Sequence, residues 1–263
     1  MPRITVDDHE FFYRDRGTGP VALFVHGFPL DSTMWLEQIQ MLSDVRRCIA
    51  PDLRGFGRSS RSTRPVLSME GHADDLAALL DALGVERVDL IGLSMGGYIA
   101  LAFAERYPER LRTLALVDTK STEDSPDAKA GREAAAERIA AEGRSGLASD
   151  MIGVLVAESA STWTRARLRT MIESTPAESI VAALMGMRDR PDRSTVLSNL
   201  AIPVAAIVGE HDVLSPIAEA DHMAVSAGGT LTIVPDAGHM SPIEDPVSVA
   251  GALRSLWSSS RSD

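Results

Sequence analysis

The stretch Val88-Asp89-Leu90-Ile91-Gly92-Leu93-Ser94-Met95-Gly96-Gly97 decides the fold. An apolar run leads into Gly-x-Ser-x-Gly, and an alanine-rich segment follows, an order that indicates a strand, a tight turn and a helix. Side chains at the glycine positions would collide with the neighbouring strand and helix. The turn exposes the Ser94 hydroxyl at a helix N-terminus, where the helix dipole favours developing negative charge. The pattern also occurs by chance in glycine-rich loops, but its strand–turn–helix context favours Ser94 as a nucleophile.

The continuous apolar run Val21-Ala22-Leu23-Phe24-Val25 suits a strand that is buried on both faces of a parallel sheet. Other short apolar segments also predict strands. The predicted strands cover residues 21–25, 47–50, 87–91, 111–117, 204–208 and 230–234. Helical spacing of apolar residues predicts helices over residues 70–83, 98–107 and 246–257. The alternation of strands and helices predicts an α/β domain.

Residues 120–195 have a different character, because no buried strand is evident there and alanine, glutamate and arginine dominate. Helices are predicted near 128–142, 146–158, 162–173 and 176–188. This segment has a net charge of −1, whereas the rest of the chain carries −10. We therefore expect a core domain made of residues 1–119 and 196–263, and a helical insertion at 120–195, here called the cap.

The composition excludes several classes of protein. The chain has 263 residues, 44% of them hydrophobic, which argues against disorder. A net charge of −11 argues against binding to nucleic acid or to an anionic membrane surface. The single cysteine, Cys48, excludes an internal disulfide framework and a thiolate metal cluster.

The sequence also gives expectations about location and partners. No apolar segment resembles a secretory signal, and the apolar runs are far below the ~20 residues that span a bilayer. We expect a cytoplasmic protein, a monomer or a homodimer, whose partner is a small-molecule substrate. No metal ion or organic cofactor is indicated.

A serine hydroxyl needs a base, and the base needs an orienting carboxylate. Among six histidines, His239 follows the last predicted strand directly, at the sheet edge where it could meet Ser94. Asp212 comes just after strand 204–208, and the order Ser94, Asp212, His239 is that of one hydrolase fold. Asp118, at the end of strand 111–117, is the alternative acid.

Acyl transfer also requires donors for an oxyanion. One donor is expected to be the N–H of Met95, the residue after the nucleophile. The other should come from the loop His26-Gly27-Phe28-Pro29 after an early strand. Pro29 has no N–H, so the N–H of Phe28 is the natural candidate. We assign no proton-transfer role to His26.

Taken together, these motifs resemble the α/β-hydrolase family over nearly the whole chain. The resemblance includes the loop Pro51-Asp52-Leu53-Arg54-Gly55-Phe56-Gly57-Arg58-Ser59, and the pairs Gly209/Asp212 and Gly238/His239. It implies a twisted, mostly parallel eight-stranded sheet flanked by helices, with a helical lid inserted after the sixth strand. It also implies that Ser94 is the nucleophile, His239 the general base and acid, and Asp212 its orienting partner.

The identity of the nucleophile narrows the function that the resemblance implies. Haloalkane dehalogenases and epoxide hydrolases of this fold have aspartate in the elbow, so Ser94 favours acyl transfer. The elbow and Leu116-Val117-Asp118-Thr119 resemble small esterases and lactonases that include 3-oxoadipate enol-lactonases. The expected function is a serine hydrolase for a small ester or lactone, acting through an acyl-enzyme.

Three alternatives stay open. One is a different reaction on the same triad, either C–C bond hydrolysis or a perhydrolase, haloperoxidase-like activity. The second is a ligand receptor without catalysis. The third is a biosynthetic lyase or cyclase that forms no acyl-enzyme.

The cap offers few candidates for substrate contact. Trp163 is the candidate substrate wall. The methionines of the cap either pack it onto the core or line an apolar acyl pocket, and they are Met151, Met171, Met185 and Met187. Arg165, Arg167 and Arg169 would fan in different directions on a helix, so they do not predict a single anion clamp. A substrate with two carboxylates would require paired cations, and this weakens the assignment to a dicarboxylate lactone.

Overall fold

In a computed structural model, which describes residues 2–259, the strands form one sheet with the order β1-β2-β4-β3-β5-β6-β7-β8. The first two strand pairs, β1 with β2 and β2 with β4, are antiparallel, and the other pairs are parallel. The strands are β1 (Arg3–Val6), β2 (His9–Arg16), β3 (Val21–Val25), β4 (Arg47–Pro51), β5 (Val88–Leu93), β6 (Leu111–Val117), β7 (Val204–Gly209) and β8 (Thr230–Val234).

The register of the parallel strands brings their carboxyl ends to one edge. Val25 pairs with Gly92, Leu93 with Val117, and Gly209 with Val234. The loops that follow β3, β5, β6, β7 and β8 therefore leave the sheet on the same side, where ligands bind in open α/β sheets.

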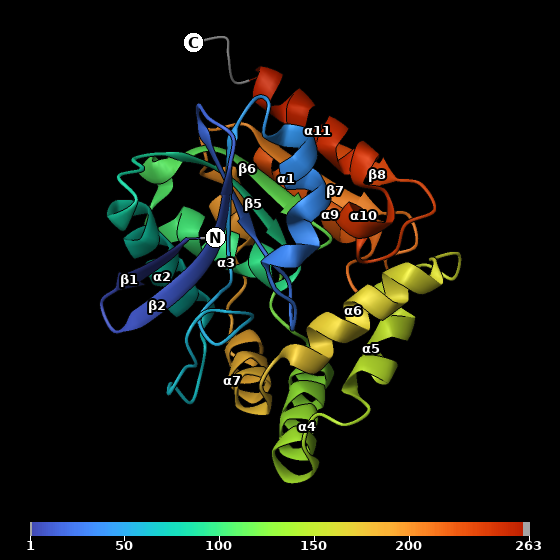
Figure 1. Ribbon diagram of the computed structural model, residues 1–263. Helices are drawn as coiled ribbons and strands as arrows, with labels where there is room; N and C mark the ends of the chain where they lie inside the picture. The colour runs from blue at the N-terminus through green and yellow to red at the C-terminus, as the bar shows by residue number, and fades with distance from the viewer. Residues whose placement is uncertain (1, 260–263) are drawn as a thin grey trace.

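Helices cover both faces of the sheet. α1 and α11 pack against each other on one face, whereas α2, α3, α8 and α9 follow one another across the other (Figure 1). These helices are α1 (Leu36–Leu42), α2 (Met69–Ala82), α3 (Met95–Arg106), α8 (Ser194–Ser198), α9 (Ile217–Ala227) and α11 (Pro246–Ser259). Shorter elements are η1 (Ser32–Trp35), η2 (Pro108–Arg110) and α10 (Ser241–Glu244).

Four further helices lie between β6 and β7, at one end of the molecule (Figure 1). They are α4 (Pro126–Glu142), α5 (Leu147–Leu155), α6 (Thr162–Ser174) and α7 (Ala177–Arg188). α4 packs against α7, and α5 against α6. The two ends of this segment are joined, because Arg193 N–H donates to Ser121 O at 2.9 Å and the Ser121 and Ser194 hydroxyls are 2.9 Å apart.

The α/β fold and the mostly parallel sheet predicted from the sequence are confirmed. The predicted strands agree with the observed ones within two residues, and the predicted helices within three. The helix after Ser94 starts at Met95 rather than Tyr98, so the glycine pair belongs to the helix. No helix in the described part of the chain has the length and apolar character needed to cross a bilayer.

Candidate active site

Ser94 lies on a strained turn between β5 and α3, with φ 52° and ψ −115°. The glycines around it allow very close backbone approaches. A Cβ at Gly92 would lie 2.2 Å from Gly96 O, and one at Gly96 would lie 2.3 Å from Val25 O. The Ser94 N–H donates to Val117 O at 3.0 Å, which ties the turn to the next strand. Strain of this kind persists only where its surroundings hold it, and it gathers at functional sites.

His239 and Asp212 form a buried pair in the loops that follow β8 and β7. His239 Nδ1 donates to Asp212 Oδ2 at 2.8 Å, and the two side chains are 3% and 0% exposed. Asp212 Oδ1 accepts from the N–H groups of Leu214 and Ser215 at 2.8 and 2.9 Å. The carboxylate is thus fixed on both oxygens, and the proton on Nδ1 leaves Nε2 of His239 as the basic nitrogen.

The alternative acid, Asp118, has other partners. Its Oδ1 accepts from Gly209 N–H at 2.8 Å, and its Oδ2 accepts from the Ser241 N–H at 3.1 Å and hydroxyl at 2.6 Å. Burial, and then the nearby Asp212, raise the pKa of Asp118 well above its usual range. Asp212 is therefore the carboxylate that the structure brings to His239.

The loop after β3 lies directly against Ser94. A Cβ at Gly27 would lie 3.4 Å from Ser94 Cβ, and Phe28 lines the same cavity as Ser94. Within residues 2–259, no hydrogen bond uses the N–H of Phe28 or of Met95. Both donors predicted for an oxyanion hole are thus unsatisfied beside the turn.

His26 links two loops and is fully buried. Its Nδ1 donates to Gly27 O at 2.9 Å, and its Nε2 accepts from Leu53 N–H at 3.0 Å. Both ring nitrogens are occupied, and burial lowers the pKa of the imidazole. His26 therefore has a structural role, and the prediction gave it no role in proton transfer.

A cavity of about 410 Å³ separates the core from the cap. From the core, Ser94, His239, Phe28 and Tyr98 line it. From the cap, its lining is mostly apolar and comes from α4, α5 and α7: Ala128, Ala135, Ile139, Leu147, Met151, Val154, Leu155, Leu184 and Met187. Such a largely apolar space with a few polar groups is typical of a small-molecule site.

The prediction that Trp163 forms a substrate wall is wrong. Trp163 lies on α6, is 63% exposed, and is not among the residues that line the cavity. Its ring faces solvent and the Arg167 guanidinium, whose carbon is 5.3 Å from the ring centroid. Of the four cap methionines, Met151 and Met187 line the cavity, whereas Met171 and Met185 pack elsewhere.

As predicted, the three alternating arginines of α6 do not come together as a single anion clamp. Arg165 donates to the backbone oxygens of Ala157 and Ala160, Arg167 pairs with Glu37, and Arg169 pairs with Glu173.

Several residues of the cavity were not singled out from the sequence. Tyr98, Lys120, Asp124 and Arg132 line it, and they come from α3, the chain after β6, and α4. In the sequence, the only indication that these residues belong to the site was that Tyr98 lies close to Ser94 and Lys120 lies close to Asp118 along the chain. Elsewhere, Glu210, His211 and Asp236 place possible ligand atoms within 4.8 Å of one another, but all three are exposed and none lines the cavity.

The model of the alpha/beta hydrolase fold family matches residues 20–246. The chain belongs to the α/β-hydrolase family. An esterase of Thermogutta terrifontis, solved with malate bound, is 41% identical with a TM-score of 0.95, and each chain covers 100% of the other. The enol-lactonase of Burkholderia xenovorans is 25% identical with a TM-score of 0.90, over 98% of this α/β hydrolase and 100% of that one.

Another relative is similar over a shorter segment. The 2-hydroxy-6-oxo-2,4-heptadienoate hydrolase of Pseudomonas putida is 41% identical over 106 residues. That segment spans 39% of this α/β hydrolase and 38% of the relative.

Proposed function

We propose that the protein is a serine hydrolase that cleaves small carboxylic esters or lactones through an acyl-enzyme. The observation that carries this proposal is the arrangement around one cavity. Ser94, on its strained turn, lines the cavity together with His239, whose Nδ1 is held by Asp212 at 2.8 Å. A nucleophile, a base and an orienting acid are the groups that a Ser-His-Asp triad uses for acyl transfer.

In this mechanism Ser94 Oγ attacks the carbonyl carbon and His239 Nε2 takes the hydroxyl proton. The carbonyl oxygen becomes an oxyanion that accepts from the N–H groups of Phe28 and Met95. His239 then gives the proton to the departing alkoxide, and the acyl-enzyme forms. Water attacks the acyl carbon, His239 takes a water proton and returns it to Ser94 Oγ, and the carboxylic acid leaves.

Hydrolysis of p-nitrophenyl acetate, butyrate and octanoate tests the proposal. We expect the wild type to turn over and Ser94→Ala to lose at least ~10³-fold in kcat. Ser226→Ala, a serine on α9 outside the cavity lining, is the matched control and should keep wild-type rates. A fluorophosphonate should modify the wild type, but not Ser94→Ala, at one serine identified by mass spectrometry. Folded protein without turnover or labelling would contradict the proposal and favour a receptor or a lyase.

C–C bond hydrolysis is a second candidate, supported by the similarity to the heptadienoate hydrolase of Pseudomonas putida. The same three side chains would then act on a ring-cleavage diketone. A panel that matches esters with such diketones separates the two reactions by their kcat/KM values. A higher kcat/KM for the diketones would replace the ester assignment.

A further inference from the structure

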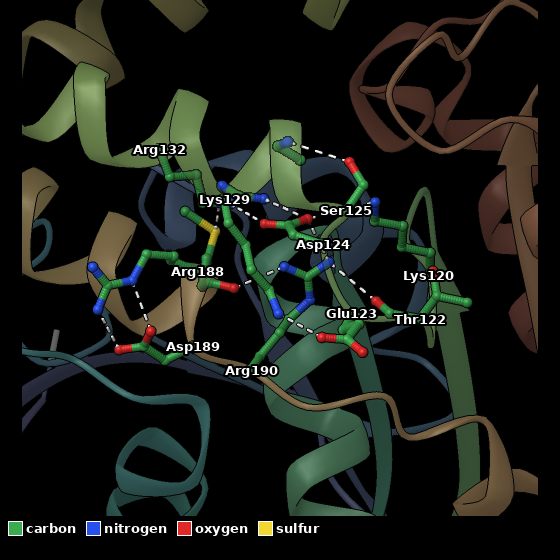
Figure 2. A network of polar contacts seen from close by, with 12 residues as sticks. Lys120, Thr122, Glu123, Asp124, Ser125, Lys129, Arg132, Arg188, Asp189 and Arg190 are labelled. Atoms are coloured by element: carbon green, nitrogen blue, oxygen red, sulfur yellow. Dashed lines mark hydrogen bonds and ion pairs between the residues drawn. The ribbon is translucent and has the colours of Figure 1, made fainter.

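Positive charge is concentrated at the cap side of the cavity. Three cations surround the carboxylate of Asp124 (Figure 2). Arg190 Nη2 donates to Asp124 Oδ1 at 2.8 Å, Lys120 Nζ lies 3.6 Å from the same oxygen, and Arg132 Nε donates to Oδ2. The Asp124 side chain is 1% exposed, so this cluster is an interior feature of the protein.

The cluster has more positive than negative charge. Burial raises the pKa of Asp124, but hydrogen bonds from Arg190 and Arg132 outweigh burial and leave that pKa well below its usual range. Asp124 is therefore ionised and balances one of the three cations. The adjacent Glu123 is half-exposed and is paired with Lys129, outside the cavity lining. Among the residues that the structure describes, two positive charges of the cluster thus have no ion-pair partner of their own.

Two of the cations face the cavity and have donors to spare. Lys120 and Arg132 line it together with Ser94 and His239. In the part of the chain that the structure describes, Lys120 has one ionic contact, at 3.6 Å, and Arg132 Nη1 faces only the sulfur of Met187 at 3.5 Å. Sulfur is a weak acceptor, so both cations retain the capacity to bind an anion.

The third cation, Arg190, connects the cluster with α3, the helix that follows Ser94. Arg190 is buried, and its guanidinium carbon lies 4.0 Å from the ring centroid of Tyr98. Tyr98 is four residues after Ser94 along α3, a rise of about 6 Å. Lys120 and Arg132 line the same cavity as Ser94, so an anion that they bind shares this space with the reacting hydroxyl.

We propose that the preferred ester carries a carboxylate, which Lys120 and Arg132 bind while Ser94 attacks the ester a short chain away. The inference rests on the proposed ester hydrolysis and names its substrate class. Charges close to cations in a cavity of low polarity interact strongly, whereas the acidic body of the protein is screened beyond about 8–10 Å. The rest of the wall is mostly apolar and suits a hydrocarbon chain between the two groups.

Matched pairs of esters test this inference. In the first pair, monoethyl adipate, which has the carboxylate on the acyl side, is compared with ethyl hexanoate. In the second pair, 4-(butyryloxy)butanoate, which has the carboxylate on the alcohol side, is compared with butyl butyrate. For at least one pair we expect a kcat/KM about 10-fold or more higher for the anionic ester. The pair that shows this preference identifies the side of the ester that carries the carboxylate.

Two variants locate the effect. Lys120→Met and Arg132→Met should each lower the ratio of kcat/KM for the anionic ester to kcat/KM for its neutral partner about 10-fold. Lys129→Met removes the same charge from α4 outside the cavity lining and should preserve the preference. Turnover of the neutral ester shows that each variant is folded. Unchanged preference in both variants, or a wild type that favours the neutral esters, would overturn the inference.

Binding to Ser94→Ala separates this inference from the proposed function. Calorimetry with monoethyl adipate and 4-(butyryloxy)butanoate should show binding that weakens when Lys120→Met is added and when NaCl rises from 50 to 500 mM. If the wild type hydrolyses none of the four esters, the proposed function fails, but this binding would still support an anion site. If Ser94→Ala binds neither anion, or binds them equally with and without Lys120→Met, the anion site is refuted.

Discussion

Two buried aspartates near His239 have different hydrogen-bond partners, so substitutions of the two should have different effects. Asp212 holds the imidazole, whereas Asp118 holds the backbone of Gly209 and Ser241. Gly209 ends β7 just before Asp212, and Ser241 follows His239 by two residues. Asp118 therefore positions the two loops, and Asp212 fixes the histidine tautomer.

Asp212→Asn should lower kcat about 10³- to 10⁴-fold, because an amide favours the wrong imidazole tautomer. Steady-state kinetics with p-nitrophenyl butyrate measure the loss, and circular dichroism checks the fold. A variant with near wild-type kcat would exclude Asp212 as the orienting acid.

Asp118→Ala should destabilise the protein by about 2–4 kcal/mol, because the buried N–H groups of Gly209 and Ser241 lose their acceptor. Urea unfolding at neutral pH measures this change in the free energy of unfolding. We expect a smaller loss of kcat than for Asp212→Asn, and the reverse order would show that Asp118 is the acid.

At the scale of elements, the sequence predicted most strands and helices but not the composition of the cavity wall. Buried parallel strands are mostly apolar runs, so β3 and β6 were found with their observed ends, whereas β8 is a largely exposed strand at the edge of the sheet. The elbow, Asp212 and His239 follow strand ends and were located in the same way. Trp163 was misplaced because its side of α6 depends on how the cap helices pack. Lys120, Arg132 and Arg190 meet only after three segments fold together.

The contribution of α5 and α6 to the site can be compared directly. Met151→Trp on α5 should narrow the cavity and lower kcat/KM for p-nitrophenyl octanoate about 10-fold relative to acetate. Trp163→Ala on α6, whose side chain is exposed, should leave this ratio within about 2-fold of wild type. The opposite result would place α6 rather than α5 against the substrate.

Glu244 of α10 connects the loop of His239 with the cap. Its carboxylate accepts from the N–H groups of Gly238 and Met240 at 3.0 and 3.3 Å, and from Ala157, between α5 and α6, at 2.8 Å. Glu244→Ala should lower kcat about 10-fold and speed amide exchange at 238–240, whereas Glu244→Gln keeps an acceptor and should lose less. Equal kinetics for both variants and wild type would show that this link does not position His239.

At the scale of the whole molecule, we expect buried histidines to lower the stability of the fold in acid. His72 of α2 is fully buried, and neither ring nitrogen has a hydrogen-bond partner among the described residues. Burial lowers the pKa of His72 to about 3, and burial together with Arg54 lowers that of His9 to about 4. The folded protein thus holds these imidazoles neutral over a range where the unfolded chain binds protons.

The stability contribution of His72 should be complete above pH 6.5 and should fall progressively as the pH decreases towards 3. The unfolded chain, with an imidazole pKa near 6.5, takes up a proton that the folded state excludes. Between pH 7.5 and 4.5 we expect a loss of about 2–3 kcal/mol from this residue. Urea unfolding at both pH values should show a smaller difference for His72→Phe, and an unchanged difference would mean that His72 is protonated in the fold.

The joined ends of the cap have an evolutionary consequence. Because Ser121 meets Arg193 and Ser194, the inserted helices leave and rejoin the sheet domain at a single point. A segment with neighbouring ends can be lengthened, shortened or exchanged at little entropic cost to the chain that carries it. Selection can therefore change which molecules enter the cavity by altering these helices, while the loops at the strand ends that carry Ser94, Asp212 and His239 stay the same.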